Sequence, residues 1–171
     1  MSRSTRIPAD DAYRQRLLGL LGGTDAVTSM ERTAARVAEV ARSLGPEAVR
    51  RPWAPGKWTG SQILSHLADV ELAVGFRLRQ ALAEPDHQIQ PFDQDAWARR
   101  YGALDTRLAL EAFLAARAWN LALVRSLSGE DLARVAVHPE RGPETVAVIV
   151  RMLAGHDLNH LHQLEALAAA I

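Results

Sequence analysis

Residues 143–171 read PETVAVIVRMLAGHDLNHLHQLEALAAAI and predict one long helix. Apolar residues recur there every three or four positions, which is the spacing of an amphipathic helix. Pro143 follows a glycine and suits the first position of a helix. His156 and His160 interrupt the apolar stripe, and at a spacing of four they lie on the same side of the helix. Because a buried imidazole needs a hydrogen-bond partner or a metal, the segment predicts a helix bundle with a polar site inside it.

The same periodicity predicts further helices, and local signals mark where they begin. They cover about residues 26–44, 59–84 and 105–127, after a shorter helix over residues 10–21. Thr59 and Gln62 form the pattern of a capping box, and Asp105 is a typical N-cap residue. No segment alternates strictly enough to predict a strand. We therefore expect an all-α protein with one domain over residues 1–171, an up-down four-helix bundle with a short extra N-terminal helix.

A long loop is expected between the second and third of the four long helices. It runs from Pro85 to Asp105, about 20 residues, which is long for a connection inside a compact domain. Phe92 and Trp97 lie within it, so part of the loop is expected to pack on the bundle. Loops of this length are often functional.

The composition is typical of a globular domain and argues against several functions. Of the 171 residues, 48% are apolar and 23% are charged, and the formal net charge is zero. The arginines are scattered among acidic residues, which argues against nucleic-acid binding. The absence of cysteine excludes disulfides, cysteine–metal sites and a cysteine nucleophile. No apolar run approaches the ~20 residues of a membrane span, and Met1–Asp11 lacks the apolar part of a signal peptide, so we expect a cytoplasmic protein.

A third histidine, His66, interrupts the apolar stripe of the second long helix in the same way. If the two histidine-bearing helices face each other, His66, His156 and His160 converge on one metal ion. Three histidine ligands leave the remaining coordination positions open, as in catalytic sites. The alternative for each residue is a hydrogen-bonded histidine of the core. The other histidines are not expected to be ligands: His162 points away from the pair, and His87 and His138 are expected to be surface residues of loops.

Other side chains near these stripes are candidates for a role in the site. Asp69, one turn after His66, would orient an imidazole, or it is a solvated helix residue. Arg77 lies three turns from His66 on the same face and would bind an anionic group, or it pairs with an acid across the bundle. Three tryptophans are candidates for the pocket wall, with packing in the core as the alternative: Trp58, Trp97 and Trp119.

Five blocks of the sequence form a recognisable set. They are KWT at 57–59, SHLADVE at 65–71, FDQDAW at 92–97, RAWN at 117–120 and HDLNHLHQ at 156–163. With these blocks the chain resembles the DinB-like (DinB/YfiT) superfamily of metal-binding four-helix bundles, from about Thr24 onward. The resemblance implies a metal triad of His66, His156 and His160, and a divalent ion, most often zinc or nickel. Some members of that family look like transferases that use a low-molecular-weight thiol, and others are described as hydrolases.

The sequence therefore predicts a metal-dependent enzyme that transfers a low-molecular-weight thiol to an electrophilic small molecule. A divalent ion on three neutral imidazoles activates either a thiol or water, so hydrolysis is the alternative chemistry. A bundle that binds metal or a small molecule without catalysis is the second alternative.

A homodimer is also expected, because the histidine-bearing helices carry apolar residues away from the histidines. Leu158 and Leu161 belong to such a stripe on the last helix, and Leu64 and Leu67 to one on the second long helix. Large apolar patches are seldom left in water. The alternative is that the short N-terminal helix covers them within one chain.

Overall fold

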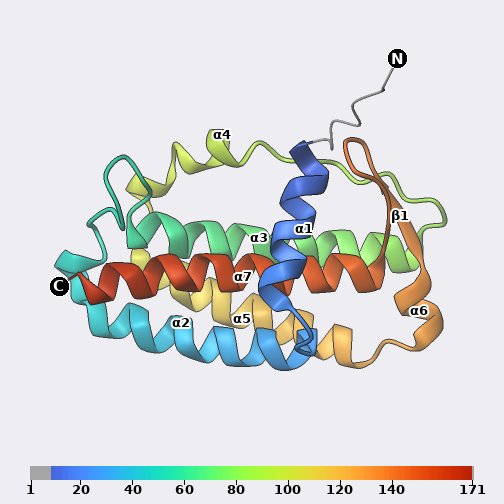
Figure 1. The fold of residues 1–171 in the computed structure, drawn as a ribbon, viewed down its shortest axis with the longest axis horizontal. Coiled ribbons are helices and arrows are strands. Elements are labelled where there is room, and N and C mark those ends of the chain that lie inside the picture. Colours follow the sequence, from blue (N-terminus) through green and yellow to red (C-terminus); the bar gives the residue numbers. More distant parts are fainter. Residues whose placement is uncertain (1–8, 171) are drawn as a thin grey trace, which may run out of the picture.

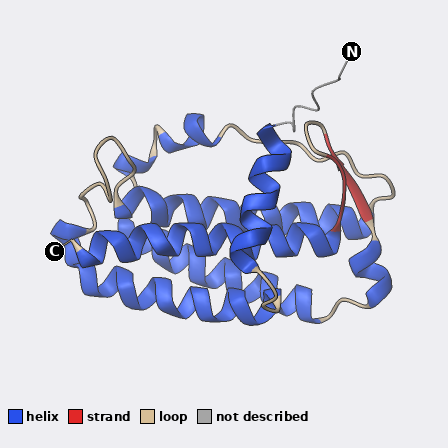
Figure 2. Ribbon diagram, in the orientation of Figure 1, coloured by secondary structure: helices blue, strands red, loops and turns tan. Residues whose placement is uncertain are grey.

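The computed structural model describes the backbone of residues 9–170 and the side chains of residues 12–170. The expected absence of a signal peptide concerns mainly residues 1–8, which lie outside the described part. Helices make up most of the described chain, and a short hairpin joins two of them (Figure 2). The elements are α1 (Ala9–Leu21), α2 (Ala26–Ala48), α3 (Gly60–Ala83), α4 (Gln94–Ala98), the 3-10 helix η1 (Tyr101–Ala103), α5 (Thr106–Arg125), α6 (Gly129–Ala133), β1 (Val135–His138), β2 (Gly142–Thr145) and α7 (Val146–Ala169).

The long helices begin where the capping residues predict. The Thr59 side chain accepts a hydrogen bond from the Gln62 N–H, and the Gln62 side chain accepts one from the Thr59 N–H, which completes a capping box. Asp105 caps α5 in the same way through the N–H of Leu108. The end of α2 differs from the expectation, since the chain bends at Gly45, with φ at 69°, and then makes one more helical turn. A positive φ is open to glycine, which explains the bend without a complete stop.

The four-helix bundle is confirmed, and it consists of α2, α3, α5 and α7 (Figure 1). The direction of the helices differs from the simple up-down order. The segment between α3 and α5 crosses back along the whole bundle, so that α3 and α5 run in the same direction, as do α2 and α7 (Figure 1). A helix of 24 residues such as α3 is about 36 Å long, a distance that the long connection can span. The crossing segment contains α4 and η1 and buries Ile89, Ala98 and Tyr101.

The hairpin before α7 is a correction to the sequence prediction. Pro143 is not the first residue of a helix; it lies in β2 and pairs with Val137 of β1. Helix α7 starts after Thr145, whose side chain accepts a hydrogen bond from the Val148 N–H. The two strands have four residues each, which is too short for a period-two pattern to be recognised. Two backbone hydrogen bonds attach the hairpin to the crossing segment, from the Ile89 N–H to the Val137 carbonyl oxygen and from the Val137 N–H to the His87 carbonyl oxygen.

A polar layer divides the interior of the bundle. One apolar cluster fills the end near the hairpin, and a second cluster fills the opposite end. On α3, the cluster near the hairpin begins at Val70 and the other one ends at Ala68. The buried polar residues between the clusters come from three helices: His66, Glu71, Arg117, Asn120, His156, Asp157 and His160.

Most residues of the apolar stripes that suggested a dimer are buried within one chain, while Leu158 is half-buried. Leu161 of α7 and both Leu64 and Leu67 of α3 are at most 7% exposed. Helix α1 lies directly on α7, where a Cβ added at Gly155 would be 2.1 Å from the carbonyl oxygen of Leu17. The N-terminal helix and the neighbouring bundle helices therefore cover these residues. The homodimer stays a prediction, but exposed apolar stripes no longer support it. Within residues 9–170, no helix is long and apolar enough to cross a bilayer.

Candidate metal centre

The three predicted histidines converge in the polar layer of the bundle. His66 projects from α3, and His156 and His160 project from successive turns of α7. The Nε2 atoms of His66 and His156 are 2.9 Å apart. One ring nitrogen from each of the three residues can be chosen so that all lie within 4.8 Å of one another. Each of the three residues is less than 9% exposed, so the site lies inside the protein.

The surroundings keep the imidazoles of His66 and His160 neutral. Burial, followed by the proximity of His156, lowers the pKa of His66 to about 3. Burial also lowers the pKa of His160 well below 6.5, with a further contribution from His156 and His66. The Oε1 atom of Gln163, one turn further along α7, is 2.8 Å from the Nδ1 of His160. A proton on Nδ1 satisfies this hydrogen bond and leaves the lone pair of Nε2 directed at the other two histidines.

This arrangement fits a metal ion. Ligands of a tetrahedral zinc ion at ~2.0–2.1 Å lie about 3.3 Å from one another, close to the observed separation of the two Nε2 atoms. The Nδ1 atoms of His66 and His156 are buried and have no hydrogen-bond partner among the described residues. Three buried imidazoles packed this closely are a costly arrangement without a ligand and a favourable one around a cation.

A buried charged network lies beside the triad, and the sequence analysis missed it. Arg117 of α5 forms ion pairs with Glu71 of α3 at 2.5 Å and with Asp157 of α7 at 2.6 Å. Asn120 donates from Nδ2 to the other carboxylate oxygen of Glu71 at 2.9 Å. The buried part of the network has two carboxylates and one guanidinium, and the half-buried Arg79 joins it by donating to the Oδ1 of Asn120. A carboxylate oxygen of Asp157 lies 3.7 Å from the Nδ1 of His156, so its negative charge favours a cation at the triad.

The aromatic candidates have different outcomes. The Trp58 ring lies 4.9 Å from the His66 ring and 6.3 Å from the His160 ring, and it packs against the apolar cluster far from the hairpin, as its alternative reading expected. Trp97 and Trp119 are 41% and 69% exposed and do not contact the histidines. Tyr101, from the crossing segment, is buried with its ring 6.5 Å from that of His66. No sequence pattern distinguished it from other loop residues.

Asp69 does not touch an imidazole. It is half-buried on α3, and its carboxylate lies near the hydroxyl of Tyr101. Burial, followed by the Asp69 carboxylate, raises the pKa of Tyr101. In the described residues, no hydrogen bond or ion pair connects Asp69 with a histidine, so the structure gives no support for Asp69 as the residue that orients a ligand.

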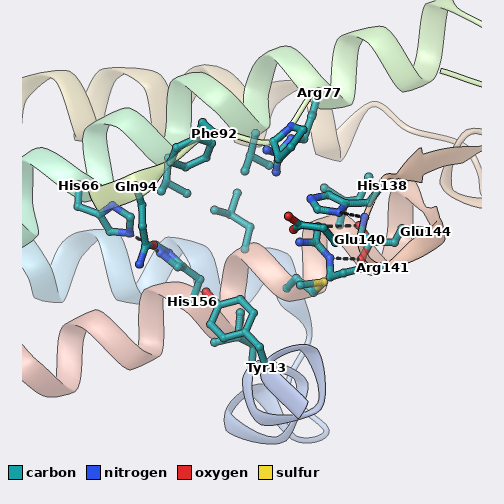
Figure 3. Close-up of a pocket in the computed structure, with 17 residues that line it drawn as sticks. Tyr13, His66, Arg77, Phe92, Gln94, His138, Glu140, Arg141, Glu144 and His156 are labelled. Carbon is teal, nitrogen blue, oxygen red and sulfur yellow. Dashed lines mark hydrogen bonds and ion pairs between the residues drawn. The ribbon is translucent and has the colours of Figure 1, made fainter. Parts of the chain in front are cut away.

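A cavity of about 360 Å³ opens from the triad (Figure 3). His66 and His156 lie at one end of it, and Arg77 lies near the other end. His138 also lines the cavity and is 3% exposed, so the expectation of a surface residue is wrong. The hairpin, which was not predicted, is what buries it. His162 is exposed and stays away from the triad, as predicted.

Comparison with known proteins agrees with this geometry. Residues 29–164 match the family model described as the DinB superfamily. A relative from Oceanobacillus iheyensis, named "Putative metal-dependent hydrolase OB0782", is 31% identical over 125 residues, which are 72% of this chain and 73% of the relative. A "Putative metal-dependent hydrolase" from Bacillus cereus is 29% identical over 129 residues, which are 74% of this chain and 73% of the relative.

A solved structure has the same fold. YfiT from Bacillus subtilis, described as a probable metal-dependent hydrolase with an unusual four-helix bundle topology, superposes with a TM-score of 0.77. The match covers 99% of this chain and 93% of that chain, at 19% sequence identity. An unusual topology agrees with the parallel direction of α3 and α5. The family match spans most of the sequence and contains all three histidines of the triad; the chain belongs to the DinB superfamily.

Proposed function

We propose that this protein is a metal-dependent enzyme that activates a small nucleophile against a small molecule held in the adjacent cavity. The observation that carries the proposal is the position of the triad, since two of its three clustered histidines, His66 and His156, line one end of a cavity large enough for a substrate. When bound, a divalent ion lowers the pKa of a water molecule or thiol so that the nucleophile exists near neutral pH.

The side chains around the triad have separate tasks in this proposal. His66, His156 and His160 hold the ion, zinc or nickel, and leave coordination positions open toward the cavity. Gln163 fixes the ring of His160 through its Nδ1. Trp58 covers the histidines on one side and limits the access of water.

Hydrolysis and thiol transfer are both consistent with this site. The names of the relatives favour hydrolysis, with water as the nucleophile. Transfer of a low-molecular-weight thiol to an electrophile requires a thiol cosubstrate, because the chain has no cysteine. The apolar middle of the cavity, which includes Val70, Val74 and Leu153, suits the apolar part of an electrophile. Action in the cytoplasm and assembly as a homodimer remain proposals beside this one.

Metal content tests the first part of the proposal. After incubation with zinc or nickel and removal of free ions, the wild-type chain should retain the metal by elemental analysis. His66→Ala and His160→Ala should lose most of it, because each removes a ligand. His162→Ala is the matched control, since that histidine is exposed on the same helix, and it should retain the metal. Equal retention by all three variants would show that the triad is not the site.

Turnover tests the second part and separates the two reactions. The metal-loaded chain is assayed with nitrophenyl esters in the absence of thiol, and with chlorodinitrobenzene in the presence of cysteine. A hydrolase should release nitrophenol only when loaded, and a transferase should form the thioether only with both thiol and metal. Absence of both activities in a metal-loaded chain over a broad panel of such substrates would favour the non-catalytic alternative.

A further inference from the structure

The cavity that starts at the histidines extends along α3 to Arg77. Arg77 stands eleven residues after His66, so the two lie on the same side of α3 with Cα atoms about 16 Å apart. Figure 3 shows His66 and His156 at one end and a group of charged side chains at the other. The lining between the two ends is apolar and includes Val70, Val74 and Leu153.

Arg77 has a positive charge that no carboxylate neutralises by direct contact. The guanidinium donates one long hydrogen bond, 3.4 Å, to the carbonyl oxygen of Gln90, and it lies 5.8 Å from the centre of the Phe92 ring. Among residues 12–170 it forms no ion pair. Burial and then the neighbouring Arg141 lower the pKa of Arg77, and the charge of Glu144 opposes this shift only in part.

The neighbouring charges do not cancel that of Arg77. Arg141 donates two hydrogen bonds to the buried Glu144, of 2.7 Å from Nε and 3.0 Å from Nη2. Both oxygens of this carboxylate are therefore paired with Arg141 and not with Arg77. His138 accepts a hydrogen bond at Nδ1 from the Glu140 N–H, which places its own proton on Nε2. Nε2 has no partner among the described residues and remains available as a donor. Glu140 also lines the cavity, but it is an exposed residue.

We propose that this end of the cavity binds a carboxylate of the substrate through the guanidinium of Arg77, with the Nε2–H of His138 as a second donor. The inference rests on the proposed function and names its substrate class. The substrate is a small molecule with a carboxylate at one end, an apolar body, and its reacting group at the histidines. A carboxylate fits better than a phosphate, because the two arginines are offset by the buried Glu144 and the exposed Glu140, and a planar guanidinium matches a planar carboxylate.

Two matched hydroxamates test the proposal on the zinc-loaded chain. Suberic acid monohydroxamate and octanohydroxamic acid have chains of equal length and the same metal-binding group, and they differ in a terminal carboxylate against a methyl group. Calorimetry should show that the carboxylate compound binds about tenfold to a hundredfold more tightly, as expected for a hydrogen bond to a charged group. Arg77→Gln should remove the difference, and Arg77→Lys should retain part of it. Arg107→Gln, which removes an exposed arginine distant from the cavity, should leave it unchanged.

A second measurement does not depend on metal. Octanoate is titrated into the metal-free chain and followed by NMR, where it should bind through Arg77 with its tail toward the histidines. Arg77→Gln should weaken this binding about tenfold or more, whereas Glu140→Gln should preserve or strengthen it by removing a negative charge.

The outcomes separate the two proposals. Equal affinity of the two hydroxamates for the zinc-loaded wild type overturns the carboxylate site and leaves the metal centre intact. Failure of both hydroxamates to bind overturns the open metal centre, while the octanoate titration still decides the carboxylate site. Octanoate binding that is unaffected by Arg77→Gln overturns the carboxylate site. Loss of octanoate binding in Glu140→Gln overturns it as well, because removal of a negative charge should not weaken a site that holds an anion by its positive charge.

Discussion

Acidification should destabilise the metal-free protein through His66. The residue is 1% exposed, and burial together with His156 lowers its pKa from 6.5 to about 3. In the unfolded chain the imidazole lies in water and takes up a proton near pH 6.5. The folded protein does not take up this proton. The free energy of unfolding is therefore unaffected by His66 above pH 6.5 and decreases as the pH falls from there to about 3.

The size of the effect follows from the distance between the two pKa values. A pH of 5 is about 1.5 units below the pKa of the free imidazole in the unfolded chain. Each unit corresponds to about 1.36 kcal/mol of free energy of unfolding. His66 alone should therefore reduce the free energy of unfolding by about 2 kcal/mol. His160 adds a loss in the same direction, since burial and the other two histidines lower its pKa as well. The free energy of unfolding of a native domain is only about 5–15 kcal/mol, so the loss is a large part of it.

Urea unfolding followed by circular dichroism, near pH 7.5 and near pH 5, measures this loss. The variant His66→Gln should lose about 2 kcal/mol less than the wild type between the two conditions. His162→Gln is the control, because the exposed residue should leave the wild-type loss unchanged. An identical loss in the wild type and in His66→Gln would refute the assignment of the pH dependence to the buried triad.

Three further predictions concern the network, the packing of α1 and the assembly. Arg117→Met leaves two buried carboxylates without a partner and should cost about 3–5 kcal/mol in urea unfolding, whereas Arg107→Met removes an exposed pair and should cost less than about 1 kcal/mol; similar costs for the two would contradict the network. Gly155→Ala places a Cβ against the Leu17 backbone, and limited proteolysis should then cut α1 faster than in the wild type, while an unchanged cleavage rate would mean that α1 does not rest on α7. Light scattering at micromolar concentration should give about twice the 18.7 kDa of one chain, and a value near 18.7 kDa excludes the dimer.

The features that the sequence predicted correctly depend on neighbours along the chain. Thr59 with Gln62, and Asp105 with Leu108, form caps within three residues, so the beginnings of α3 and α5 can be read from local signals. The triad was predictable because each histidine interrupts an apolar stripe, where the cost of burial demands an explanation.

The features that the sequence did not predict depend on residues far apart. The partners in the Glu71–Arg117 pair are 46 positions apart, and in a single sequence nothing distinguishes this arginine from the exposed ones. His138 is buried only because the hairpin folds against the crossing segment. Pro143 satisfied the rule for a first helical position, but Thr145 provides the cap that α7 uses, and pairing with β1 takes up the residues before it. The direction of α5 depends on the path of the crossing segment, which carries no periodic signal.

The crossing segment also has a consequence for the kinetics of folding. Because α3 and α5 run parallel, they cannot dock as a hairpin of adjacent helices, and α7 must return to α2 and α3 from the end of the chain. His66 and His156 are 90 positions apart, so the site forms only after a long loop has closed. The chain should therefore fold more slowly than an up-down bundle of equal length. A metal ion that binds after this late step should slow unfolding and leave the folding rate nearly unchanged.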